Sequence, residues 1–68
     1  MKLEYTNVQC VFKYADDRKV LIAVEDEEVW IPRICVSYKS DAELDELTRN
    51  DDFEIQIATW KAKQLGVD

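Results

Sequence analysis

The chain has 68 residues, which make one domain spanning 1–68 and leave no room for a second core. Hydrophobic residues are 47% of it, with a single Gly and a single Pro, so it is too apolar for a disordered tail or a linker. Its 15 acidic and 9 basic residues give a net charge of −6, which disfavours non-specific binding to a phosphate backbone and suits a basic partner.

The first half of the chain has the pattern of three antiparallel strands. Residues 8–14 alternate between apolar and polar side chains, which predicts a strand with one buried face. After a polar break at 15–18, the apolar run 19–24 indicates a central strand covered on both faces. A second polar break at 25–28 precedes a third strand at 29–32. The short breaks between the strands predict a meander.

Two further strands are indicated in the second half. Residues 33–39 are consistent with a fourth strand that has Ile34, Val36 and Tyr38 on one face. The cleanest alternation in the chain is at 53–57, and it predicts a strand.

A helix signature lies between these two segments. Residues 40–52 begin with Ser40, which can act as N-cap, and Glu43 completes a capping box. Such a short helix is stable only if Leu44 and Leu47 dock on the core, and a loop is the alternative.

The last segment of the chain predicts a second helix. Thr59 can cap it, Trp60 lies near its start, and Gly66 is placed where a glycine ends a helix. Lys61 and Lys63 have the favourable charge for its C-terminal end. The whole order predicts an α+β fold, which is a small antiparallel sheet or partly open barrel of four or five strands with a short C-terminal helix.

Two stretches together resemble a group of small bacterial and phage-encoded proteins. The segment "KVLIAVEDEEVWIPR" (19–33) is similar to their apolar strand, acidic turn and Trp-Ile/Val-Pro-Lys/Arg step. The segment "FEIQIATWKAKQLGV" (53–67) is similar to their ending, a strand followed by a short helix with a Trp near its start and a Gly at its exit. The resemblance implies a phage or mobile-element setting and no particular chemistry. The chain departs from the group at Ile34-Cys35 and at Ala58.

The sequence also bears on location. The first ten residues are polar and mixed, unlike a signal peptide, and no stretch approaches the roughly 20 apolar residues of a membrane span. We therefore expect a cytoplasmic protein, of a bacterial host, with no membrane partner.

Residue types that catalyse reactions or bind metals are scarce. The chain has no His, so the commonest general base and the commonest metal ligand are both missing. Cys10 and Cys35 form no C-x-x-C pair; we expect two core thiols, and a disulfide is the alternative. The acidic pairs do not follow the Ca²⁺-loop template. The sequence predicts no enzyme, no metal and no cofactor.

The abundant acidic residues favour binding to another protein. Acidic runs at 25–28 and 41–54 can form one negative face, which suits the basic groove of a nucleic-acid-binding protein. We expect an inhibitor of the anti-CRISPR or anti-restriction type, and an ordinary solvated surface is the alternative. An open sheet edge would also allow a homodimer. The candidate partner-binding residues are Trp30, Arg33, Glu25, Asp26, Glu27, Glu28, Asp51 and Asp52.

The aromatic residues support a second, less favoured hypothesis. If Trp30, Tyr38 or Trp60 is exposed, it can stack on single-stranded bases as an accessory of phage replication or recombination. A basic groove would then come from Lys13, Arg18, Lys19, Arg33 and Lys39. The alternative is that the aromatic residues are core, and on that basis we expect Trp60→Ala to cost about 3–5 kcal/mol. The direction in which Trp30 faces stays open.

Overall fold

The structure, a computed structural model, describes residues 4–67 and contains a four-stranded antiparallel sheet of order β3-β2-β1-β4. The elements are β1 (Tyr5–Ala15), β2 (Lys19–Val24), β3 (Glu27–Pro32), a 3-10 helix (Arg33–Cys35), α1 (Tyr38–Leu44), β4 (Asp52–Ala58) and α2 (Thr59–Leu65). This arrangement confirms the predicted α+β fold, the meander of the first three strands and the C-terminal helix. The sheet is open and does not close into a barrel.

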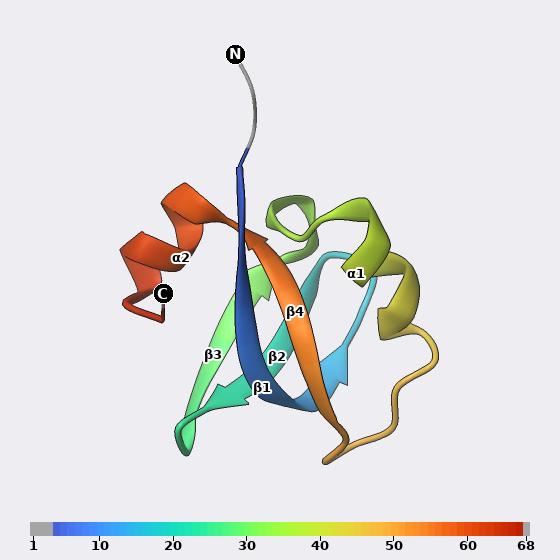
Figure 1. Ribbon diagram of the computed structural model, residues 1–68. Coiled ribbons are helices and arrows are strands. Elements are labelled where there is room, and N and C mark those ends of the chain that lie inside the picture. Colours follow the sequence, from blue (N-terminus) through green and yellow to red (C-terminus); the bar gives the residue numbers. More distant parts are fainter. Residues whose placement is uncertain (1–3, 68) are drawn as a thin grey trace.

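The sheet curls because its longest strand bends. β1 has an irregularity in its pairing with β2 between Phe12 and Tyr14, which is where a β-bulge increases the local bend and twist. Figure 1 shows β1 curving from the layer that it forms with β4 to the layer of β2 and β3, with α1 and α2 on opposite sides. The core lies inside this curl. Its largest fully buried side chains are Ile22, Ile31, Leu44, Ile55, Ile57 and Val20.

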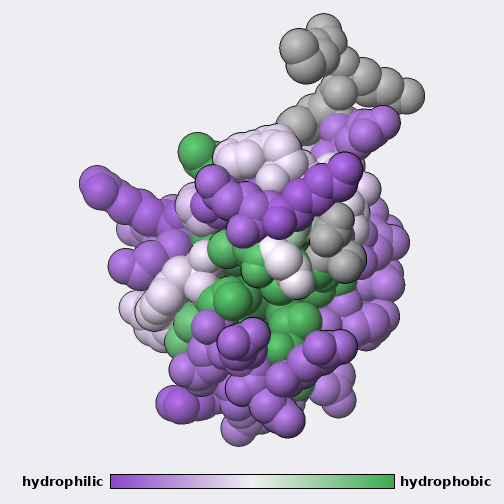
Figure 2. All heavy atoms as spheres, turned by 90° about the vertical axis from the view of Figure 1, so that its left-hand side faces the viewer, coloured by the Kyte–Doolittle hydropathy of each residue, from purple (hydrophilic) through white to green (hydrophobic). Residues whose placement is uncertain are grey.

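One side of the curl is less completely closed. Partly buried apolar side chains from two strands and from the C-terminal segment pack against the core, namely Val24, Val29, Leu65 and Val67. Figure 2, which views the molecule from the side of α2, shows hydrophobic side chains at the surface framed by hydrophilic ones. The expectation that both faces of β2 are covered is wrong. Val20 and Ile22 are buried, but Leu21 and Ala23 point the other way and are half-buried.

The two hairpins form through different turn chemistry. At the β1–β2 turn, the Asp16 carboxylate accepts hydrogen bonds from the backbone N–H groups of Arg18 (2.8 Å) and Lys19 (2.9 Å). The β2–β3 turn has two residues, Glu25 (φ 51°) and Asp26 (φ 69°), whose positive φ angles are those of a type I′ turn. The polar break predicted at 25–28 is therefore only two residues long, and β3 begins earlier than expected.

The predicted strand at 33–39 is wrong. Pro32 has no N–H group, and the chain leaves the sheet after the backbone N–H of Arg33 bonds to the carbonyl of Arg18 (2.8 Å). A turn of 3-10 helix follows, and a single bridge joins Val36 to Ile57. The three side chains expected on one face consequently separate. Val36 is buried, whereas Ile34 (92%) and Tyr38 (91%) are almost fully exposed.

The predicted helix in the middle of the chain exists, but it begins and ends early. Ser37 is the N-cap of α1, because its side chain accepts the N–H of Ser40 (3.2 Å). Ser40, predicted as the cap, lies inside the helix, where its buried hydroxyl accepts the backbone N–H of Gln56 on β4 (2.9 Å). Leu44 is buried as expected, and Leu47 lies beyond the helix end, partly buried.

The C-terminal helix matches its prediction except at its start and at Lys61, which lies outside the last turn, where only Lys63 is found. Thr59 is the first helical residue and not the cap, and its hydroxyl hydrogen-bonds to the Thr6 hydroxyl (2.9 Å). Gly66 ends α2 in the left-handed conformation (φ 74°), as its position predicted. Both α-helices have seven residues, and no helix within 4–67 is long and apolar enough to cross a membrane.

Candidate functional site

The two cysteines are free and buried, which confirms the prediction of core thiols. Burial raises the pKa of the Cys10 thiol to about 12, against a smaller lowering by a hydrogen bond from the backbone of Ile55. The thiol is therefore protonated at neutral pH and unsuited to nucleophilic attack. Within residues 4–67, no group of three or more acidic, Cys or His side chains is arranged to hold a metal ion.

The β2–β3 turn and the start of β4 lie at one end of the sheet, the lower end in Figure 1, and both have exposed acidic residues. The pairing of the strands places them there, because Glu28 pairs with Ala23, Ala23 with Val11, and Val11 with Asp52. Glu28 on β3 and Asp52 on β4 thus stand at the two ends of one row across four strands. We call the exposed carboxylates of Glu25, Asp26, Glu27, Glu28 and Asp52 the acidic end.

A shallow hollow joins the two acidic segments. It has a volume of about 410 Å³ and is lined by Gln9, Cys10, Val11, Ala23, Glu25 and Asp52. Glu25 and Asp52, which are far apart in the sequence, therefore share one concave surface. Among the described residues, no ion pair or side-chain hydrogen bond involves any carboxylate of the acidic end. The ion pairs within residues 4–67 are all formed by Arg33, which is not part of the acidic end.

Asp51, the remaining acidic residue predicted for the site, has a structural contact. Its carboxylate accepts hydrogen bonds from the backbone N–H (2.8 Å) and the hydroxyl (2.9 Å) of Thr48. These bonds hold the pKa of Asp51 below its usual value. Asp51 therefore shapes the loop before β4, while its neighbour Asp52 is left free.

Arg33 is likewise held within the chain. Its guanidinium donates to the Asp41 carboxylate (2.8 Å) and to the backbone carbonyl of Asp16 (2.8 Å), and Asp45 lies 3.8 Å away. The hydrogen bond to Asp41 raises the pKa of Arg33 further above its usual value, against a smaller effect of desolvation. These contacts tie the start of α1 to the β1–β2 turn. A hollow of about 560 Å³ beside them is lined by Asp17, Arg33, Ile34, Val36, Tyr38, Asp41 and Asp45.

Trp30 faces outwards, which answers the question that its sequence context left open. It is 47% exposed on the outer face of β3, while its neighbour Ile31 is fully buried. The Tyr14 ring, 51% exposed, meets the Trp30 ring edge-to-face with centroids 6.1 Å apart. The Lys19 ammonium lies 4.9 Å from the centre of the Trp30 ring. We call Tyr14, Lys19 and Trp30 the aromatic patch.

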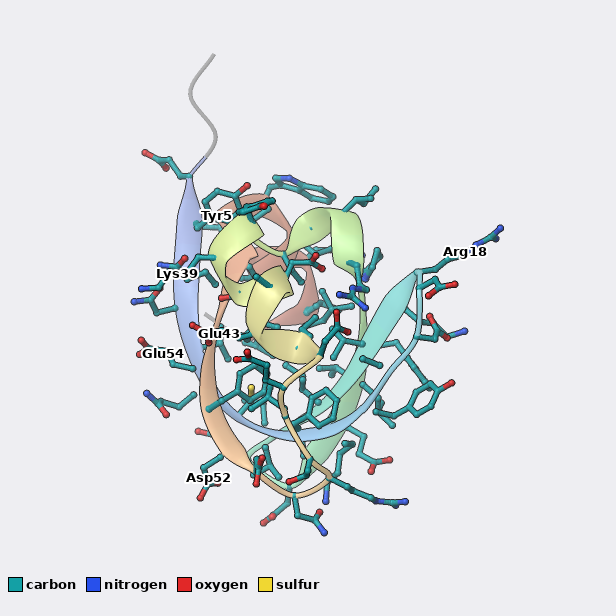
Figure 3. The ribbon with its side chains drawn as sticks, turned by 90° about the vertical axis from the view of Figure 1, so that its right-hand side faces the viewer. Tyr5, Arg18, Lys39, Glu43, Asp52 and Glu54 are labelled. Carbon is teal, nitrogen blue, oxygen red and sulfur yellow. The ribbon has the colours of Figure 1, made fainter. Side chains whose placement is uncertain are left out.

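The expectation that Trp and Tyr side chains fill the core is wrong more generally. Trp60 is 57% exposed, and Tyr5 is also exposed. Sequence reasoning did not anticipate the exposure of Ile34, and the only signal for it was the Pro32 that ends β3. The basic residues that a groove would need are dispersed. Figure 3 shows Arg18 and Lys39 on different sides of the molecule, and Lys13 bonds to the Asn50 side chain (2.7 Å).

No family model matches this chain, and comparison with curated proteins and with solved structures gives no match either.

Proposed function

We propose that this chain is a non-catalytic binding protein of phage or mobile-element origin that docks its acidic end on a basic surface of another protein. The partner would be a nucleic-acid-processing or defence complex, and the chain would inhibit it in the manner of an anti-CRISPR or anti-restriction protein. The observation that carries the proposal is the meeting of the β2–β3 turn and the start of β4 around one acidic hollow.

The geometry supports mimicry of a nucleic acid. Neighbouring strands lie about 4.8 Å apart, so the row from Glu28 to Asp52 spans at most about 14 Å across the curled sheet. A nucleic-acid backbone presents several phosphates over such a length, and a basic groove that holds them would meet a carboxylate at each end of this row. Because the carboxylates of the acidic end have no ion pairs among residues 4–67, docking need not break internal salt bridges.

Competition for DNA tests the proposal directly. The assay follows the fluorescence polarisation of a labelled duplex bound to purified restriction endonucleases and RNA-guided effector complexes. We expect the protein to displace the duplex from at least one of them, and the triple variant Glu25→Lys/Glu28→Lys/Asp52→Lys to lose this ability. Failure to displace the duplex from any member of the panel would contradict the proposal.

A matched control separates a local surface from overall charge. The variant Glu4→Lys/Glu43→Lys/Glu46→Lys makes the same change in net charge at three exposed positions outside the acidic end. It should inhibit as the wild type does. If both triple variants lose inhibition equally, the effect comes from net charge, and the acidic end is not the docking surface.

A second candidate function, binding of single-stranded nucleic acid, is favoured by the aromatic patch. Trp30 and Tyr14 are about half exposed, and Lys19 lies beside them, which is the combination on which bases stack. The net charge of −6 opposes this function.

Titration with a labelled single-stranded oligonucleotide distinguishes the two functions. Stacking predicts binding that weakens steeply with salt and that Trp30→Ala abolishes, while Trp60→Ala leaves it unchanged. Absence of binding at low salt would eliminate the second candidate.

A further inference from the structure

The outer edge of β3 is an unpaired sheet edge. The two-residue turn makes Val24 and Glu27 a hydrogen-bonded pair, and such pairs recur at every second position along β2 and β3. The backbone groups of Val29 and Ile31 consequently bond to β2, whereas those of Glu28 and Trp30 point away from the sheet. No hydrogen bond from elsewhere in residues 4–67 reaches the backbone of these two residues.

The opposite edge of the sheet is covered over part of its length. On β4, the carbonyl of Gln56 accepts the backbone N–H of Ser37 (2.9 Å), and its N–H donates to the Ser40 hydroxyl (2.9 Å). Val36 forms a further bridge with Ile57. The segment that leads into α1 therefore occupies the C-terminal part of this edge, whereas no segment among residues 4–67 bonds to the outer edge of β3.

We propose that a second copy of this chain pairs with the β3 edge, forming a two-fold symmetric dimer with an eight-stranded sheet. A two-fold axis at Trp30 places Trp30 opposite the partner's Trp30, and Glu28 opposite the partner's Pro32. Every outward N–H of β3 then has an acceptor, since Pro32 has no N–H to leave unpaired. The two tryptophans meet on the outer face and extend the contact that each makes with its own Tyr14.

The charges along the hairpin favour this antiparallel pairing. β3 has Glu27 and Glu28 at its turn end, and at its other end Lys19 pairs with Pro32 and Arg18 bonds to the chain just beyond. Antiparallel pairing brings the acidic end of one copy beside the basic end of the other, whereas parallel pairing would place like charges together. An axis at Glu28 would set two carboxylates directly opposite each other.

Sedimentation equilibrium of the purified chain tests the dimer. We expect the mass to rise with concentration from 8.0 kDa towards twice that value. Glu28→Pro removes an N–H that only the dimer uses, and should raise the dissociation constant by about tenfold or more. Glu28→Thr, which keeps the N–H, serves as control and should dimerise more tightly than the proline variant. A circular dichroism melt shows that each variant is folded.

Charge reversal and cross-linking check the register. Lys19→Glu should weaken the dimer, and Lys19→Glu/Glu28→Lys should restore it. Mild oxidation should cross-link Trp30→Cys, because opposed positions lie about 5.5 Å apart. Glu28→Cys should stay uncross-linked, because two copies of position 28 lie about 14 Å apart. A chain that stays monomeric at millimolar concentration, or cross-linking at position 28 and not at 30, would overturn the proposal.

Discussion

Trp30 and Trp60 lie at the surface because the curled sheet encloses a narrow core that smaller side chains fill. Most of the inward positions on the strands hold Val and Ile residues, and Ile22, Ile55 and Ile57 are fully buried. These β-branched side chains suit a pleated, tightly curved surface. A large indole ring has more room outside the curl, where part of it still covers apolar neighbours.

We expect Trp60→Ala to lower the free energy of unfolding by less than about 1 kcal/mol, because the side chain is more than half exposed. The loss of about 3–5 kcal/mol expected for a buried tryptophan therefore does not apply to Trp60. Ile57→Ala, at a fully buried position, should cost about 2–5 kcal/mol. Urea unfolding followed by circular dichroism measures both. Equal losses for the two variants would show that Trp60 supports the core.

The Cys10 thiol should make stability depend on pH in the alkaline range. Its pKa is raised from the ordinary value of 9.0 to about 12 in the folded chain, so the unfolded chain loses the thiol proton first. The free energy of unfolding should therefore fall as pH rises from about 9 towards 12, by up to about 1.4 kcal/mol per pH unit. Cys10→Val should remove this part of the dependence. Identical pH profiles for the two proteins would contradict the assignment.

At the scale of elements, the β2–β3 turn offers a stabilising change. Asp26 has a φ of 69°, a conformation that costs a non-glycine residue roughly 1–2 kcal/mol. Asp26→Gly should relieve this strain. Because glycine is freer in the unfolded chain, part of the gain is offset, and the free energy of unfolding should rise by about 0.5–1 kcal/mol. Asp17→Gly makes the same charge change at a position without positive φ and should destabilise. Thermal melts of both variants check the difference.

The elements that the sequence predicts well are those whose signals are local. β2 spans the predicted 19–24, and β4 extends the predicted strand at 53–57 by one residue at each end. Gly66 ends α2 where its type requires. Their alternation and turn chemistry need no information from distant residues.

The strand predicted at 33–39 is wrong, and α1 begins earlier than its prediction, because distant contacts determine this part of the chain. The bond from Arg33 to Arg18, and those of Ser37 and Ser40 to Gln56, pull the chain off the sheet edge and start α1 early. Taken alone, the alternation of Ile34, Val36 and Tyr38 is indistinguishable from that of a strand. The sequence of residues 33–39 contains no sign that this segment will lie beside Gln56.

At the scale of the whole molecule, the composition predicted an acidic surface but not its shape. Both acidic runs are visible in the sequence, yet only the pairing of Val11 with Ala23 and with Asp52 brings them together. Register depends on which residues face the core across three strands, and a single sequence does not specify it. The same sheet separates the carboxylates around Arg33, those of Asp41 and Asp45, from the acidic end. Of the acidic run at 41–54, only Asp52 therefore belongs to the acidic end.

The uncompensated carboxylates of the acidic end should make the folded chain sensitive to salt. Its net charge is −6, and the ion pairs among residues 4–67 are confined to Arg33, so mutual repulsion is weakly offset at low ionic strength. Raising NaCl from about 10 mM to 500 mM shortens the screening length from about 30 Å to below 8 Å and should raise the melting temperature by a few degrees. Glu25→Gln/Glu28→Gln/Asp52→Asn should flatten this response, and Glu4→Gln/Glu43→Gln/Glu46→Gln should retain most of it. Equal responses from both variants would mean that repulsion is spread over the surface and is not concentrated where the strands bring the acidic residues together.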